Sequence, residues 1–84
     1  MSVRILYFSW LREYIGVPSE EIETNCKTVI ELVGELSASD KRYNLAFSDL
    51  SAVRVAIDQN MVDTFESNIV GAKEVAFFPP MTGG

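Results

Sequence analysis

The sequence predicts an α+β roll, in which a mixed β-sheet wraps over one main helix. Strand-like and helix-like segments follow one another in the order β, short α, β, α, β, β, β. Only one segment is long enough for a helix that covers a sheet face, and several connections are too short for repeated parallel crossovers. With 84 residues, 48% of them apolar, the chain can bury one small core, so we expect a single domain over residues 1–80.

The first strand is expected at residues 3–8, which are β-branched or aromatic. Apolar side chains on both of its faces favour a central place in the sheet. Ser9 can cap a short helix, which the Gly-Val-Pro segment at residues 16–18 would end. Residues 20–25 form a second strand whose polar outer face is typical of a sheet edge.

The main helix is expected from residue 28 to about residue 39. Thr28 and Glu31 form a capping box at its start, and apolar residues follow at the spacing of one helix face. Residues 40–50 look irregular, with at most one helical turn near residues 44–47. This helix is the element that must cover the sheet.

The second half of the chain is expected to supply three further strands, at residues 53–57, 61–62 and 74–78. Residues 58–60 are typical of a turn between the first two of these, and residues 63–73 form a loop. Pro79 and Pro80 end the last strand, because proline cannot continue a hydrogen-bond ladder.

Composition excludes several functions. The formal net charge of −5 argues against nucleic-acid binding, since contacts to phosphate supply most of that affinity. The chain has no histidine, and its single cysteine cannot build a common zinc site or an internal disulfide. Phosphate-binding glycine loops are absent, and no apolar stretch approaches the length of a membrane helix. We therefore expect a cytoplasmic protein that is not an enzyme by itself and binds no metal.

The most informative segment is the chain end, Met81-Thr82-Gly83-Gly84. After two prolines these four residues are expected to form a flexible tail that reaches roughly 13 Å from the domain. Glycine has no side chain, so Gly83 and Gly84 can enter a channel little wider than a backbone. A terminal carboxylate is a poor electrophile, so it would react only after activation, for example as an acyl-adenylate. The segment is therefore a candidate substrate for partner enzymes, although a frayed end would have the same composition.

Residues 74–84, EVAFFPPMTGG, resemble the C-terminal signature of the small-subunit family of molybdopterin synthase, and residues 3–13, VRILYFSWLRE, resemble its first strand and helix. The resemblance implies a β-grasp, or ubiquitin-like, fold. It implies that Gly84 is adenylated and then converted to a thiocarboxylate, while Pro80, Met81, Thr82 and Gly83 form the tail that enters a channel in the partner. Met81-Thr82 departs from the commoner valine followed by a small residue.

The resemblance also implies partners. These are a large subunit in a heterotetramer with two copies of each chain, an E1-like adenylyltransferase that uses ATP, and a sulfur donor. The thiocarboxylate would give its sulfur to cyclic pyranopterin monophosphate and so build the molybdopterin dithiolene. This chain would bind no cofactor, and the catalytic groups would lie on the large subunit. Nucleic acid and membrane are not expected partners.

Phe78 is expected to be exposed and to contact the large subunit, and Phe8 and Met61 are candidates for neighbours in this contact. The alternative is that they are ordinary core. Cys26 is expected to be a small buried hydrophobe rather than a sulfur relay.

Three other functions stay open on the sequence. A thiazole-pathway sulfur carrier has the same fold but is typically shorter. A ubiquitin-like modifier would share the adenylation step and then join lysines, and a plain interaction domain would carry an inert tail.

Overall fold

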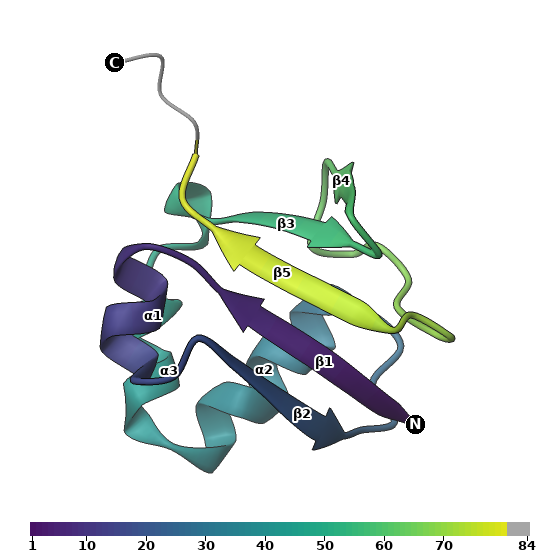
Figure 1. Ribbon diagram of the computed structural model, residues 1–84, viewed down its shortest axis with the longest axis horizontal. Coiled ribbons are helices and arrows are strands. Elements are labelled where there is room, and N and C mark those ends of the chain that lie inside the picture. The colour runs from purple at the N-terminus through teal and green to yellow at the C-terminus, as the bar shows by residue number, and fades with distance from the viewer. Residues whose placement is uncertain (81–84) are drawn as a thin grey trace.

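The computed structural model describes residues 1–80. It contains a mixed five-stranded sheet with helices on one side (Figure 1). In chain order the elements are β1 (Ser2–Tyr7), α1 (Trp10–Ile15), β2 (Ser19–Glu23), α2 (Val29–Ser39), α3 (Lys41–Ala46), the 3₁₀-helix η1 (Leu50–Ala52), β3 (Arg54–Ile57), β4 (Asn60–Val62) and β5 (Glu74–Phe78). The strand order is β2-β1-β5-β3-β4, with β1 and β5 parallel and the other pairs antiparallel. The predicted mixed sheet is confirmed.

The places of the first two strands in the sheet are as predicted. β1 lies between β2 and β5, and β2 lies at an edge. Val3, Ile5 and Tyr7 on β1 are almost completely buried, because alternate residues of a strand face the same side. These side chains meet the helices on the covered face of the sheet. The residues between them face the opposite side.

The main helix begins with the predicted capping box. The Thr28 side chain accepts a hydrogen bond from the Glu31 amide at 3.3 Å, and Glu31 Oε1 accepts one from the Lys27 amide at 2.7 Å. The return bond thus reaches one residue further back than the motif requires. Four residues of α2 join the core: Val29, Leu32, Val33 and Leu36. No helix within residues 1–80 is long and apolar enough to cross a membrane.

The prediction of an irregular segment at residues 40–50 is wrong. Asp40 caps α3 by accepting a hydrogen bond from the Arg42 amide at 3.0 Å, and Asp49 caps η1 through the Ser51 amide at 3.1 Å. Both elements are short, so they carry too few residues for a clear helical period. Tertiary packing stabilises α3, since Tyr43 is buried in the core.

Ser9 does not cap α1 with its side chain, contrary to the prediction. Its backbone has φ 57° and ψ −134°, a region that residues other than glycine rarely adopt. Such a conformation typically costs on the order of 1–3 kcal/mol and persists only where neighbouring structure imposes it.

The turn between β3 and β4 is tied to the start of β5. Asp58 and Gln59 have positive φ values of 49° and 71°, as expected for a tight hairpin turn. Asp58 Oδ1 accepts hydrogen bonds from the amides of Lys73 and Glu74, at 2.9 and 3.0 Å. The Asp58 amide in turn donates to the Glu74 carbonyl at 2.9 Å. These bonds hold the loop at residues 63–73 against the sheet where β5 begins.

A carboxylate joins the first two strands to α3. Glu20 Oε2 accepts a hydrogen bond from the Tyr7 hydroxyl at 2.7 Å and another from the Tyr43 hydroxyl, while Arg42 donates to the Tyr43 oxygen at 3.1 Å. Glu20 is therefore bonded within the fold and is not simply part of the polar outer face expected for residues 20–25. Burial, followed by the bond to Glu20, raises the pKa of Tyr7 well above its ordinary value of 10.0, and the same two causes raise the pKa of Tyr43.

We expect alkaline pH to destabilise the fold through Tyr7. Because the folded state keeps this proton to higher pH than the unfolded state, its contribution is complete below pH 10 and falls above it, by up to about 1.4 kcal/mol per pH unit. Urea unfolding between pH 8 and 11 should show a shallower decline for Tyr7→Phe than for the wild type. Tyr14→Phe, at a residue 51% exposed on α1, is the matched control. Equal slopes for Tyr7→Phe and wild type would contradict this assignment.

Candidate functional site

The base of the C-terminal segment lies at the end of the two central strands. Because β1 and β5 are parallel, both end at the same edge of the sheet, beside α1 (Figure 1). The Phe8 amide donates to the Phe77 carbonyl at 3.1 Å, which extends this pairing one residue past β1. Pro79 and Pro80 then leave the sheet. The predicted channel residues Met81, Thr82 and Gly83, and the reactive Gly84, lie outside the described residues.

A shallow apolar groove runs from this point along the uncovered face of the sheet. Its volume is about 520 Å³, and its lining residues are Leu6, Phe8, Gln59, Glu74, Ala76, Phe78, Pro79 and Pro80. The register pairs Ala76 with Leu6 of β1 on one side and with Ala56 of β3 on the other, and Ala76 itself is buried. Six of the eight lining residues are apolar, and the two polar ones, Gln59 and Glu74, come from the Asp58 turn and the start of β5.

The structure brings two of the three predicted contact residues together. Phe8 is 46% exposed and Phe78 is half-buried, and both line the groove next to Pro80. Met61, 66% exposed on β4, pairs with Ala56 and so lies on the same sheet face. It lines a separate hollow of about 440 Å³ instead, together with Arg54 and residues of η1, β3, β4 and the loop after β4.

Sequence reasoning missed Leu6 and Ala76 as groove residues. The alternation of β1 contained the signal for Leu6, because Leu6 and Phe8 must face the side opposite to Tyr7. No comparable signal marked Ala76, since a small residue becomes part of a groove only through the larger residues beside it.

The residue before Phe78 belongs wholly to the core. Phe77 is completely buried, with its ring nearly parallel to that of Tyr7 at 6.3 Å and edge-on to that of Phe47 at 4.9 Å. These contacts fix the ends of β1 and β5 from beneath. The core therefore holds in register the two strands that carry Phe8 and Phe78 on the outer face.

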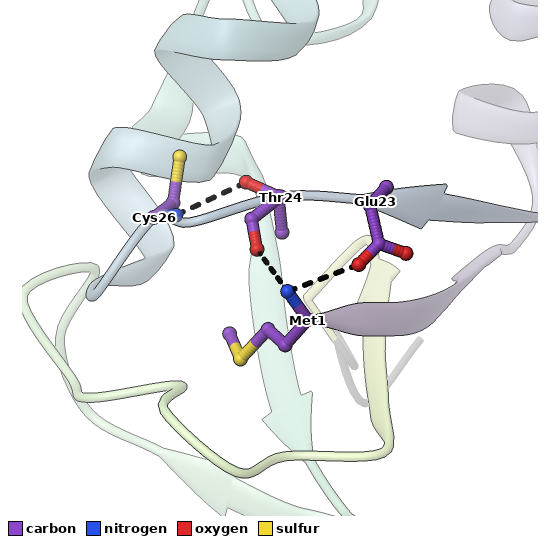
Figure 2. A network of polar contacts seen from close by, with 4 residues as sticks. All are labelled: Met1, Glu23, Thr24 and Cys26. Carbon is purple, nitrogen blue, oxygen red and sulfur yellow. Dashed lines mark hydrogen bonds and ion pairs between the residues drawn. The ribbon is translucent and has the colours of Figure 1, made fainter.

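Cys26 lies at the other end of the sheet and is half-buried, less than predicted. Figure 2 shows its amide bonded to Thr24 Oγ1 at 3.1 Å, while the Met1 ammonium donates to the Thr24 carbonyl at 2.9 Å and pairs with Glu23 at 3.2 Å. β1 separates Met1 from Phe8 by roughly 20 Å at about 3.3 Å per residue. Burial, with a hydrogen bond to Glu35, raises the pKa of the Cys26 thiol. This placement argues against direct sulfur relay to the chain end.

The groove is suited to docking, since most of its lining residues are apolar. Within residues 1–80, no group of three or more histidine, cysteine, aspartate or glutamate side chains could hold a metal ion. Glu74 is the one ionisable residue in the lining of the groove. An apolar surface beside the base of a chain end can bind a partner that receives that end.

Comparison with known proteins gives matches over nearly the whole chain. The model of the ThiS family matches residues 5–84. The molybdopterin synthase sulfur carrier subunit of Escherichia coli is 34% identical over 82 residues, which are 98% of this chain and 99% of that protein. A putative molybdopterin converting factor subunit 1 from Pyrococcus furiosus has a TM-score of 0.71 and 26% identity, over 96% of this chain and 99% of that one.

A likeness in fold alone extends to a solved complex. The structure of subunits 1 and 2 of molybdopterin-converting factor from Helicobacter pylori contains a chain with a TM-score of 0.66 and 20% identity, matched over the full length of both chains. These neighbours confirm the ubiquitin-like β-grasp fold.

The two faces of the sheet should respond differently to substitution. We expect Phe77→Ala to lower the free energy of unfolding by about 3–5 kcal/mol, because it opens a cavity among Tyr7 and Phe47. Phe8→Ala, on the open face, should cost less than about 1 kcal/mol. Urea denaturation followed by circular dichroism measures both, and similar losses for the two variants would contradict the assignment of faces.

Proposed function

The chain belongs to the ThiS family, and on this premise we propose that it is the sulfur-carrier small subunit of a molybdopterin synthase. The observation that carries the proposal is the combination of a chain ending in Gly83-Gly84 with an apolar groove that begins at Pro80. The near full-length match to a named sulfur carrier subunit supports it. The domain would present its end to other proteins, and those proteins would supply the catalytic groups.

The proposed cycle begins at the carboxylate of Gly84. An E1-like adenylyltransferase joins this carboxylate to AMP from ATP, with release of pyrophosphate. A sulfur donor then displaces AMP, which leaves a thiocarboxylate. The thiocarboxylate sulfur forms a C–S bond to cyclic pyranopterin monophosphate as a C–O bond of that substrate breaks, and water then cleaves the acyl C–S bond, which restores the carboxylate and leaves the sulfur on the product. Because a dithiolene holds two sulfur atoms, each molybdopterin consumes two charged carriers. ATP use agrees with a cytoplasmic location and requires no cofactor on this chain.

The large subunit is the proposed occupant of the groove, in an assembly with two copies of each chain. A relative is named as one subunit of a synthase, and a structural neighbour was solved as a complex of two subunits. Four residues beyond Pro80 span at most roughly 13 Å, so the catalytic groups of the partner must lie within that distance of the groove. An anionic chain end and a net charge of −5 favour a partner with a basic pocket.

The chemistry is tested by intact mass after incubation with the adenylyltransferase, ATP and the sulfur donor. We expect a gain of roughly 16 Da, and fragmentation must place it at Gly84 because methionine oxidation adds nearly the same mass. A variant lacking Gly84 should show no such gain. An unmodified carboxylate in the wild type would refute the carrier function, and isopeptide adducts on lysines would favour a ubiquitin-like modifier.

Docking in the groove is tested by calorimetric titration with the large subunit. We expect Phe8→Ala to raise Kd about tenfold, since an aromatic anchor beside the chain end is lost. Tyr14→Ala, at an exposed aromatic residue outside the groove lining, is the control and should bind as the wild type does. If both variants bind equally well, the groove is not the docking surface.

A further inference from the structure

The connection between β1 and α1 consists of two residues, Phe8 and Ser9. Before it, Tyr7 points into the core, and after it, Leu11 points into the core again; both are almost completely buried. The chain must therefore turn from a strand into a helix within two residues while returning to the same side of the sheet. Figure 1 shows a curved connection that leads from the arrowhead of β1 into α1.

Hydrogen bonds fix the backbone on both sides of this connection. The Phe8 amide donates to the Phe77 carbonyl at 3.1 Å, and the Ser9 carbonyl accepts from the Glu13 amide in the first turn of α1 at 3.3 Å. Because these hydrogen bonds hold the backbone on both sides, the chain changes direction at Ser9. Its φ of 57° and ψ of −134° lie in a region that glycine adopts without strain and other residues rarely adopt. The Ser9 side chain makes no capping bond that would explain this conformation.

The strained residue lies next to a functional candidate. Phe8 is an aromatic residue left 46% exposed, and it lines the groove with Phe78 and Pro80. Because hydrogen bonds hold the strand and the helix on either side, an ordinary negative φ at residue 9 would require a compensating change in the backbone at Phe8. Backbone strain that surrounding structure imposes is often found where a side chain must be held ready for binding.

We infer that Ser9 is a positioning residue, whose backbone with positive φ holds the Phe8 ring at the groove beside the base of the C-terminal segment. This inference rests on the proposed docking of the large subunit. It adds that the docking surface is set before the partner arrives. The Ser9 side chain itself need not touch the partner, so the inference concerns backbone conformation and not serine chemistry.

A double-mutant cycle tests the inference by titration with the large subunit. Ser9→Val introduces a β-branched side chain that resists positive φ, and we expect it to raise Kd about tenfold. In the Phe8→Ala background the same substitution should change Kd less than twofold, because its effect passes through Phe8. Ser9→Gly, which accepts the same backbone conformation, should bind as the wild type does.

A purely structural role would give a different result. Ser9→Val would then lower the melting temperature equally in both backgrounds and leave Kd unchanged in both, and this would overturn the inference. An equal loss of affinity in both backgrounds would overturn it as well. Ser9→Thr is a milder β-branched variant for use if Ser9→Val does not fold, with circular dichroism at 10 °C as the check.

The failure of the inference is separable from the failure of the proposed function. If Phe8→Ala weakens binding but Ser9→Val does not, only the role of Ser9 is refuted. If the wild type does not bind the large subunit, or Phe8→Ala binds as well as the wild type does, then docking in the groove fails and the role of Ser9 fails with it.

Discussion

The parallel pairing of β1 with β5 is the constraint on which the rest of the structure depends. It joins residues from opposite ends of the chain, such as Ile5 and Val75. Closing so long a loop has an entropic cost, and burial of the Tyr7 and Phe77 rings offsets it. Because the strands are parallel, they end at the same edge of the sheet. This places the start of α1 and Pro80 at one point, which an antiparallel pair would have separated.

Because side chains alternate along a strand, one face of the sheet packs in the core and the other carries the groove. Consecutive residues of β5, Phe77 and Phe78, point to opposite sides, and so do Tyr7 and Phe8 at the end of β1. On the inner side, aromatic packing and the carboxylate of Glu20 hold the strand ends together. On the outer side, the same strands carry the groove. The rigidity of the groove is therefore a consequence of the core beneath it.

Residues 1–80 are suited to presenting the chain end to a partner, and no perturbed acid or base lies in the groove. The groups whose pKa values are raised, Tyr7, Tyr43, Arg42 and the Cys26 thiol, all keep their protons at neutral pH, and none of them lines the groove. In the proposed function the reactive atom is at the chain end and the partner supplies the charges. The backbone conformation inferred to matter at Ser9 serves docking in the same way, because it sets the direction of the Phe8 side chain.

The sequence by itself determined the central and edge strands, the capping box at Thr28 and the mixed sheet, because each depends on short-range periodicity, local hydrogen bonding or residue type. It did not reveal α3, because this helix is too short to show a clear helical period. The cap at Asp40 and the burial of Tyr43 are its main determinants. The bonds of Glu20, the conformation of Ser9 and the composition of the groove were decided only by the tertiary structure. Each of them arises where segments distant in sequence meet, and strand register, which no local pattern encodes, determines which residues meet there.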